Sequence, residues 1–390
     1  MSAWGQAQAF GPLFIETELG VPSEDVPRWT GILTAAPLLV AAPLSPFWGV
    51  LADRYSRKVV ILRCLLLGSV GYALAAVSQD VWQFLGIRFL LGLTFGGNAV
   101  ILAIMAGLVP NRWLGLAIGI TQMMFPLGSS IGPLLGSGLI AWLGLRGMFA
   151  VNAGITGVAF LLVVLCYREP RHDRDQHLGV LARLRAVAGV TWRQEPIRYA
   201  FVIFALFAGG WTLVTPFIPV LIARVYEGEN VVLAIGLVMA ANGALAGLAA
   251  PVAGRLADRL GPTRLITFCM VGLMLMSAML VFTATPLAVA AAMVLGAIPY
   301  GASNTVLYAH LARVTPREHM TAIMSLSPLA RNSAMLAAPL LGAVVAGIGL
   351  YAVFASAVVV YAVAIGMSRV LARSTPERAP TVEVAASREA

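Results

Sequence analysis

Residues 49–58 read Gly-Val-Leu-Ala-Asp-Arg-Tyr-Ser-Arg-Lys, a compact group of charges between two long apolar runs. The pattern returns at residues 254–264 as Gly-Arg-Leu-Ala-Asp-Arg-Leu-Gly-Pro-Thr-Arg, with the same Leu-Ala-Asp-Arg core. A proline precedes each copy at the same distance, at Pro46 and at Pro251. A motif that is repeated so far along the chain indicates a duplicated architecture rather than one enlarged domain.

The composition indicates a protein embedded in lipid. Hydrophobic residues make up 59% of the chain, charged residues 11%, and the mean hydropathy is +0.88. Soluble domains contain about 25% charged residues, so most of this surface must face lipid. The formal net charge of +9 comes without basic runs interleaved with aromatics, which indicates charge that sets membrane topology rather than nucleic-acid binding.

Nothing in the sequence indicates a cofactor, a metal site or an enzyme. The three cysteines, Cys64, Cys166 and Cys269, lie in apolar runs without metal-ligand spacing. No nucleotide-binding loop and no nucleophile paired with a base is present, so ATP-driven pumping is also unsupported.

Apolar runs of spanning length follow one another along the chain. They predict an all-α polytopic membrane protein with twelve transmembrane helices in two pseudo-symmetric six-helix bundles. The runs are approximately 3–18, 28–52, 59–79, 82–109, 113–142, 146–167, 199–224, 231–257, 264–284, 286–312, 319–347 and 349–371. The predicted organisation is an N-terminal bundle at 1–167, a cytoplasmic linker at 168–198, a C-terminal bundle at 199–371 and a disordered cytoplasmic tail at 372–390.

The first run is short for a spanning helix, which needs about 20 apolar residues. Because the chain begins with this run already under way, we expect helix 1 to be shortened and the true start to lie upstream of Met1.

The basic residues predict the orientation. With both termini in the cytoplasm, the inner joints and the tail hold 21 of the 26 Lys and Arg residues. The outer joints hold Arg28, Arg146 and Arg224, and the spans hold Arg88 and Arg331. This bias follows the positive-inside rule.

The two halves, the linker and the repeated loop together resemble the major facilitator superfamily. The loop pattern of that family, Gly-x-Leu-Ala-Asp-Arg-x-Gly-Arg-Lys, is met by residues 49–58 except that Ser56 replaces the second Gly. Within the family, the chain looks most like the twelve-span drug:proton antiporters, and among them the bacterial multidrug efflux pumps. The resemblance implies a monomeric transporter of the bacterial inner membrane that exports lipophilic small molecules by alternating access, with the proton as coupling ion.

The repeated loop is the first candidate for a mechanical role. Gly49 lets backbones approach closely, and Asp53 can face a helix N-terminus or an arginine when the halves close. The resemblance implies a latch for the outward-facing state; the alternative is simple topogenic charge. The gating residues are Gly49, Asp53, Arg54 and Arg57, with Gly254, Asp258 and Arg259 in the second copy.

Helix 5 carries a second family pattern. Gly128, Gly132 and Gly136 form a thin stripe, and Pro133 permits a bend. This resembles the antiporter signature Gly-x-x-x-Gly-Pro-x-x-Gly-Gly, with Ser137 in the last place. In the family this stripe seals the outer half of the pathway against helix 8; the alternative is generic packing.

Two arginines within spans are candidates for coupling, because an intramembrane charge is costly and is usually functional. Arg88 resembles the family's Arg-x-x-x-Gly motif, but it lies close enough to the outer end to reach the interface instead. Arg331 lies near the middle of helix 11 and should face the central cavity or a partner.

Other polar or aromatic residues fall at mid-span, where substrate sites of such transporters lie. They suit bulky, lipophilic ligands, although each could equally serve local packing. These cavity candidates are Asn98, Gln122, Trp211, Asn242, Tyr300, Asn304 and Asn332.

A proton antiporter usually needs an acid inside the membrane, and none lies clearly inside a span. Asp53, Glu16 or His310 would then have to carry the proton, with His310 expected at the inner interface. An uncoupled facilitator or metabolite carrier, and a sensor-like relative that moves no solute, therefore remain alternatives.

We predict that Asp53→Asn impairs transport and leaves the amount of protein unchanged, because an amide cannot form the charged contacts of a latch. Transport assays on cells with matched expression test this. Normal transport by the variant would leave Asp53 as topogenic charge.

Overall fold

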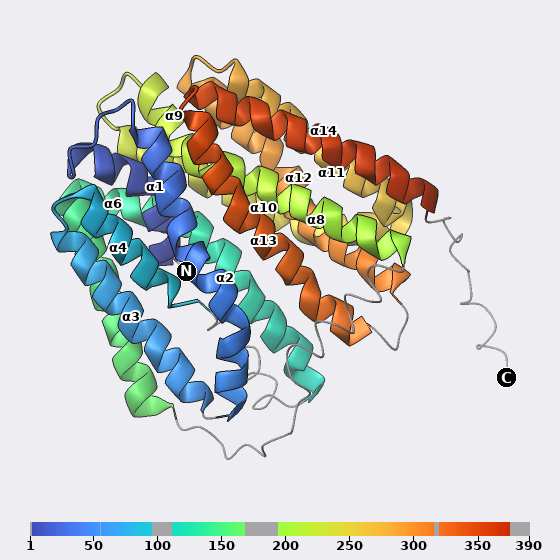
Figure 1. Cartoon of the computed structure of the whole chain (residues 1–390), viewed down its shortest axis with the longest axis horizontal. Helices are drawn as coiled ribbons and strands as arrows, with labels where there is room; N and C mark the ends of the chain where they lie inside the picture. The colour runs from blue at the N-terminus through green and yellow to red at the C-terminus, as the bar shows by residue number, and fades with distance from the viewer. Residues whose placement is uncertain (1, 55, 96–110, 168–193, 316–319, 375–390) are drawn as a thin grey trace.

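The computed structural model describes residues 2–54, 56–95, 111–167, 194–315 and 320–374. For residues 45–54, 111–127, 258, 320–330 and 374 it describes the backbone alone. All elements in these ranges are helices, and the predicted all-α class is confirmed (Figure 1).

The helices of the first half follow the predicted apolar runs closely. They are α1 (Ser2–Thr17), α2 (Val26–Arg54), α3 (Arg57–Val77), α4 (Val81–Gly92) and α6 (Asn111–Cys166). The second half of the fourth run lies outside the described residues. The fifth and sixth runs are joined in α6, which breaks at Gly144, where φ is 71° and ψ is 177°. Glycine tolerates this backbone at no steric cost, so α6 contains two spans.

The second half begins with a broken helix. The seventh run is divided into α8 (Glu195–Val214), the 3-10 turn η1 (Thr215–Phe217) and α9 (Ile218–Val225). The remaining runs form α10 (Val231–Leu260), α11 (Pro262–Val281), α12 (Pro286–Val314), α13 (Met320–Ala346) and α14 (Leu350–Ser374).

Seven helical stretches in the described part of the chain are long and apolar enough to cross a membrane. They are Arg57–Val77, Gly128–Cys166, Glu195–Val225, Val231–Ala257, Pro262–Val281, Pro286–Val314 and Leu350–Arg373. The helices Val81–Gly92 and Arg331–Ala346 are shorter but also apolar.

Short polar residues define where the helices begin. Asp80 caps α4 by accepting hydrogen bonds from the backbone N–H groups of Trp82 and Gln83, at 2.8 and 2.9 Å. Ser56, the departure from the family loop pattern, caps α3 by accepting from Val59 N at 3.3 Å. Such caps satisfy N–H groups that the first helical turn leaves without partners.

The two halves meet along two pairs of helices. In Figure 1, α2 lies beside α13, and α6 lies beside α10. At the first contact, a Cβ built on Gly31 would lie 2.6 Å from the carbonyl oxygen of Pro339 and 2.7 Å from Cβ of Ala343. Only a residue without a side chain allows α2 and α13 to come so close.

The contact between α6 and α10 also depends on glycine. A Cβ on Gly236 would lie 2.9 Å from Oγ of Ser137, and one on Gly243 would overlap with Oγ of Ser130. Gly31, Gly236 and Ser137 all lie in the halves of their helices nearest the predicted outer joints. The close contacts therefore hold the halves together at the end where the predicted outer joints lie.

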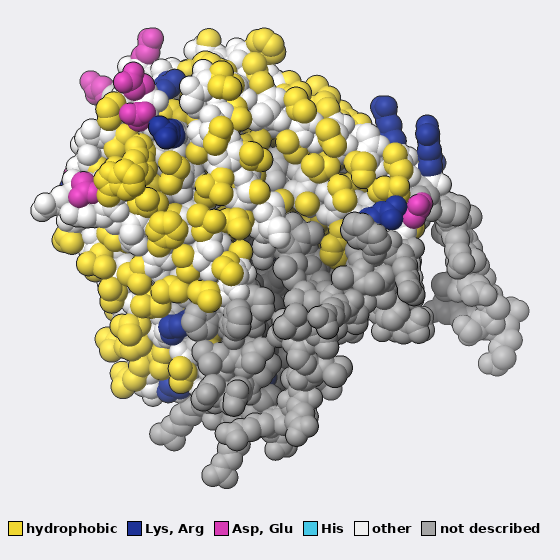
Figure 2. Space-filling model, in the orientation of Figure 1, with side chains coloured by type: hydrophobic (Ala, Val, Ile, Leu, Met, Phe, Trp, Pro, Cys, Tyr) yellow, Lys and Arg dark blue, Asp and Glu magenta, His cyan; other side chains and the backbone are white. Residues whose placement is uncertain are grey.

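Polar contacts reinforce the same end. Arg146 donates to Glu18 at 2.7 Å and to the carbonyls of Ala76 and Ser78, which joins α1, α3 and α6. Across the halves, Arg224 donates to the carbonyl oxygen of Ser23 at 3.3 Å. Figure 2 shows the acidic side chains concentrated at this end of the molecule.

We predict that Ser137→Cys combined with Gly236→Cys forms a disulfide between the halves, because their β carbons are adjacent. The three native cysteines are replaced by alanine and a protease site is inserted within residues 168–193. After cleavage, the two fragments should stay joined on a non-reducing gel.

Gly247 is the control, because it lies on α10 like Gly236 but a Cβ there has nothing within 4 Å. Ser137→Cys with Gly247→Cys should leave the fragments separate. Equal cross-linking by both pairs, or by neither, would contradict the contact.

Candidate functional site

The repeated loop lies at the ends of α2 and α10. Gly49, Asp53 and Arg54 occupy the last two turns of α2, where the backbone alone is described, and Arg57 begins α3. Asp258 near the end of α10 is also described by its backbone alone. The latch contacts therefore lie outside the described side chains and stay a prediction.

The described part of the loop shows how it is anchored. Lys58 Nζ donates to the carbonyl oxygens of Val164, at 3.0 Å, and of Tyr167. These carbonyls lie at the end of α6, where helical partners are missing and a positive charge is favourable. In the second half, Arg313 donates to the carbonyl of Ala257, at 3.4 Å. Each loop is thus joined by a basic side chain to a neighbouring helix.

The glycines of the second copy have different surroundings. A Cβ on Gly254 would meet only Cγ2 of Thr305, at the ordinary distance of 3.5 Å, so α10 and α12 are less tightly packed there. Gly261 ends α10 with φ at 83°, a conformation that glycine adopts readily. Arg259 is exposed.

The stripe on helix 5 lies between two neighbours. Its glycines face α1: a Cβ on Gly132 would lie 2.7 Å from the carbonyl oxygen of Ser2, and one on Gly136 would lie 2.9 Å from Gln6 Cγ. Gly128 also lies on this side, since its carbonyl oxygen is 3.4 Å from a Cβ built on Gly5.

The neighbour across the halves, α10, instead meets Ser130, Ser137 and the carbonyl oxygen of Pro133. The fifth span, the first part of α6, does pack against the eighth span, α10, but through serines rather than through the glycines of the motif. The two rows differ because residues one position apart on a helix face directions about 100° apart.

Arg88 is the centre of a buried polar network in the first half. Its side chain is 2% exposed, Nε donates to the carbonyl oxygen of Leu33 at 2.9 Å, and Nη2 donates to Gln8 Oε1 at 3.3 Å. Thr34 Oγ1 donates to the same Gln8 oxygen at 3.4 Å. The guanidinium also lies 5.2 Å from the ring centre of Trp4, a cation–π distance.

The sequence left open whether the side chain of Arg88 reaches the membrane interface or stays inside the protein, and this geometry decides between the two. The side chain does not extend to the membrane interface, because it is buried among α1, α2 and α4 beside a small pocket lined by Gln8, Thr34 and Phe84. Its charge is matched by a carbonyl, an amide and an aromatic face rather than by an acid.

Three buried or half-buried amides of the first half, Gln6, Gln8 and Asn152, were not singled out by the sequence pattern. Asn152 Nδ2 donates to Gln6 Oε1 at 2.8 Å, and both side chains are buried. Gln6 and Gln8 face Asn152 and Arg88 from α1. The sequence feature that could have indicated these contacts is the pair Gln6 and Gln8, two amides two residues apart inside an apolar run.

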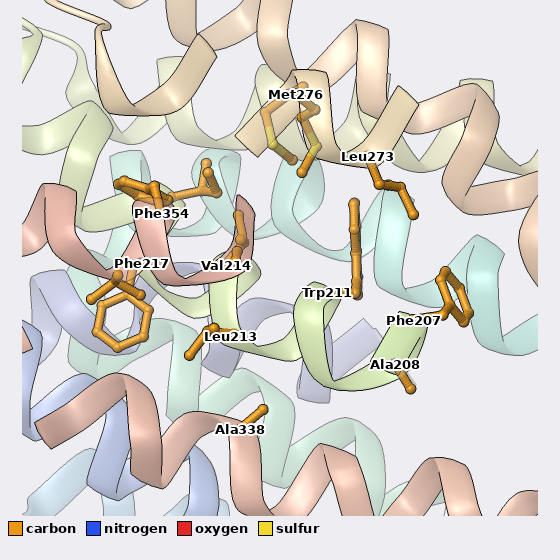
Figure 3. Close-up of a cluster of buried hydrophobic side chains, with 14 of the residues drawn as sticks. Phe207, Ala208, Trp211, Leu213, Val214, Phe217, Leu273, Met276, Ala338 and Phe354 are labelled. Carbon is orange, nitrogen blue, oxygen red and sulfur yellow. The ribbon is translucent and has the colours of Figure 1, made fainter. Parts of the chain in front are cut away.

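Aromatic side chains gather in the second half. Trp211 on α8 stacks on Tyr300 of α12, with ring centres 3.7 Å apart and planes 14° apart. The ring centres of Phe207 and Tyr300 are 5.8 Å apart, and Tyr361 of α14 also lies close to Tyr300. We call these four residues the aromatic cluster. Figure 3 shows Trp211 and Phe207 leaving α8 on one side, opposite Ala208.

Glycine makes room for this cluster. A Cβ on Gly210 would lie 2.6 Å from Cζ of Tyr361, so only glycine lets this ring pack beside α8. Of the cavity candidates on the sequence, Trp211 and Tyr300 are brought into contact, and Asn304 lies one turn from Tyr300 on the same face of α12.

Arg331 lies beside the aromatic cluster. It interacts electrostatically with Tyr300, and its buried Nε has no hydrogen-bond partner among the described residues. It lies about 17 Å along α13 from Met320 and about 22 Å from Ala346, too far from either end for its side chain to reach water easily. An arginine at the centre of a bilayer costs about 3 kcal/mol, so a compensating interaction is needed.

The other candidates have other surroundings. Asn242 is 6% exposed and donates to the carbonyl oxygen of Met293 at 2.8 Å, which joins α10 to α12. Asn332 is exposed. Asn98 and the side chain of Gln122 lie outside the described residues.

His310 differs from expectation. It was expected at the inner interface, but its side chain is only 1% exposed. It lies near Arg313, and its buried Nε2 has no hydrogen-bond partner among the described residues. His310 lies on the side of α12 that faces the protein core. Its position along the helix could not indicate this, because position does not tell which side of a helix is buried.

Long apolar helices in two groups, with polar and aromatic side chains buried at mid-span, define a polytopic membrane protein of the transporter class. The chain belongs to the Major Facilitator Superfamily, whose family model matches residues 1–235 and 200–389. The resemblance inferred from the loop motifs is confirmed.

Curated relatives and solved structures agree with this family. The chain is 32% identical over 291 residues to multidrug resistance protein MdtG of Serratia proteamaculans (strain 568), covering 73% of this chain and 69% of that protein. It is 27% identical over 353 residues to a multi-drug resistance efflux pump PmrA homolog of Lactococcus lactis subsp. lactis (strain IL1403), covering 89% and 85%. A bacterial homolog of the human lysosomal transporter Spinster, in its inward-facing and unoccupied conformation, shares the fold with a TM-score of 0.76 at 17% identity, covering 97% of this chain and 96% of that chain.

We predict that Arg88→Gln destabilises the protein, because the shorter amide leaves the Leu33 carbonyl and Gln8 without their charged donor. Losing such bonds costs about 2 kcal/mol, which lowers the midpoint of thermal unfolding by about 2 °C for a chain of this length. Unfolding of the purified variant in detergent measures this. Arg28→Gln, at an exposed position, is the control and should leave the midpoint unchanged; an equal midpoint for both variants would contradict the role of the network.

Proposed function

We propose that this protein is a secondary transporter that exports lipophilic small molecules or drugs by alternating access, with proton antiport as the driving force. The observation that carries the proposal is the aromatic cluster, where Trp211 stacks on Tyr300 at mid-span. Flat aromatic faces with few charges suit bulky apolar ligands. The names of the relatives, multidrug resistance protein and efflux pump, support the same substrate class.

The contacts between the halves support the alternating-access part. Gly31, Gly236 and Gly243 hold the halves close toward the outer end. We propose that the bundles at 1–167 and 199–371, joined by the linker at 168–198, rock about the mid-span site until these contacts separate. The latch residues of the two loops would then close the inner end.

The topology proposed here places both termini, including the tail at 372–390, in the cytoplasm of a bacterial inner membrane. The distribution of Lys and Arg supports this orientation. We further propose that the protein works as a monomer, with a small molecule, the proton and the lipid bilayer as its partners.

The proposed route of the proton involves three candidate carriers. Glu16 accepts a hydrogen bond from Ser23 beyond the end of α1, and His310 is buried in α12. With Asp53, these are the proposed proton carriers, and Arg88 and Arg331 would modulate them. Because no Asp or Glu occupies the sequence between residues 81 and 168 or between 259 and 317, an uncoupled facilitator is the second candidate.

We predict that cells making this protein expel a lipophilic aromatic dye and that a protonophore stops the efflux. Trp211→Ala should reduce efflux about tenfold, because a stacking face worth about 1 kcal/mol and its apolar area are lost. Trp142→Ala is the matched control, since Trp142 is 91% exposed and lies outside the cluster; its efflux should match that of the unmodified protein.

The outcomes separate the candidates. Efflux that continues with the protonophore, down the dye gradient alone, would support the facilitator. Absence of efflux would favour a narrow metabolite carrier or a sensor-like relative.

A further inference from the structure

The second half holds a positive charge within its spans and no acid to match it. From residue 259 to residue 376 the sequence contains one Asp or Glu, Glu318, which lies in the joint before α13. Arg331 lies about three turns further along the chain, near the middle of that helix. The other acids from residue 199 to residue 376 are Glu227 and Glu229, before α10 begins, and Asp258, near its end. Among the described side chains of this half, no carboxylate therefore lies at the depth of Arg331.

Arg88 shows what a satisfied intramembrane arginine looks like in this chain. It has a carbonyl, an amide oxygen and an aromatic face as partners. By contrast, the buried Nε of Arg331 has no hydrogen-bond partner among the described residues. A donor left in this state in a low-dielectric interior requires an acceptor from elsewhere.

Two further polar atoms near Tyr300 are in the same state. The hydroxyl of Tyr361, whose side chain is fully buried, and Oδ1 of Asn304 have no hydrogen-bond partner among the described residues. Tyr361 and Arg331 both lie close to Tyr300, and Asn304 is one turn away on α12. Buried polar groups are nearly always hydrogen-bonded, so three such atoms around one stacked aromatic pair indicate a ligand site.

We propose that this site binds an aromatic molecule that carries one acidic group, and that the preferred substrates are therefore lipophilic anions rather than cations. The acidic group accepts from Arg331 Nε and from the Tyr361 hydroxyl, and the ring lies against Trp211 and Tyr300. A donor on the ligand, such as a hydroxyl or amide N–H, bonds to Asn304 Oδ1. This inference rests on the proposed function, since it names the substrate class of the same mid-span site.

The charge balance explains the selectivity. An anion at Arg331 forms a charge-assisted hydrogen bond and neutralises the arginine in a medium of low dielectric constant. A cation there would be repelled by the guanidinium, and a neutral ligand would leave the charge unmatched. The stacked pair contributes apolar surface to all three ligand types equally, so Arg331, together with the Tyr361 hydroxyl, separates them.

The test compares three probes of one shape: 1-naphthylacetate, the neutral 1-naphthylacetamide and 2-(1-naphthyl)ethylammonium. Binding to the full-length protein in lipid nanodiscs is measured by calorimetry at neutral pH. We expect the anion to bind about tenfold more tightly than the amide, since a hydrogen bond to a charged group is worth about 1.5 kcal/mol or more. The cation should bind most weakly.

Variants assign the preference to residues. Arg331→Gln should weaken binding of the anion about tenfold and leave binding of the amide unchanged, while Arg331→Lys, which keeps the charge, should retain part of the preference. Tyr361→Phe should weaken binding of the anion about threefold. Arg28→Gln, on an exposed outer residue, should change nothing. If Arg331→Gln does not fold, the lysine and phenylalanine variants still decide the matter.

Equal affinity for the three probes, tighter binding of the cation, or an equal loss for all probes in the Arg331 variants would overturn the inference. Efflux of the same probes from proteoliposomes with a proton gradient separates this result from the proposed function. Anion-selective binding without efflux would keep the site and contradict export. Efflux of the amide and the ammonium probe, with no preference for the anion, would keep export and contradict the site.

Discussion

The close approach of the two halves at the outer end is the constraint on which the rest of the molecule depends. In lipid there is no hydrophobic force between helices, so packing distance decides which helices stay together. Gly31 against Pro339 and Gly236 against Ser137 bring backbones nearer than any larger residue permits. The Arg88 network lies at the level of the Gly31 contact, because Arg88 bonds to the carbonyl of Leu33, two residues further along α2. The stacked rings of Trp211 and Tyr300 lie nearer the middle of their spans.

The two intramembrane arginines differ in how the free-energy cost of burying their charge is compensated. Arg88 is surrounded by the Leu33 carbonyl, Gln8 and Trp4, so its charge is dispersed over polar groups that also hold α1, α2 and α4 together. Arg331 lies beside the aromatic rings of the second half, and among the described residues its Nε has no hydrogen-bond partner. The first arrangement is that of a structural centre, and the second is the basis of the ligand site that we propose.

Several individual residues show the limits of pattern reasoning. Ser56 breaks the family loop pattern, yet it caps α3 through Val59 N, a role that a glycine cannot fill with a side chain. The helix 5 glycines match the family signature, but they face α1, while Ser130 and Ser137 meet α10. His310 is buried although its place along the chain indicated an interface. The sequence placed each residue along its helix, and the local cap at Ser56 or the packing of neighbouring helices determined what the side chain contacts.

The sequence by itself determined the helical class, the order of the spans and the membership of the family, because hydropathy and loop motifs are local properties that lipid imposes on every segment. Only the tertiary structure decided which side chains meet. The pairing of Gln6 with Asn152, the stacking of Trp211 on Tyr300 and the contrast between Arg88 and Arg331 join residues far apart in the chain. Helix rotation and tilt determine such pairs, and both depend on the packing of several helices at once rather than on any one segment.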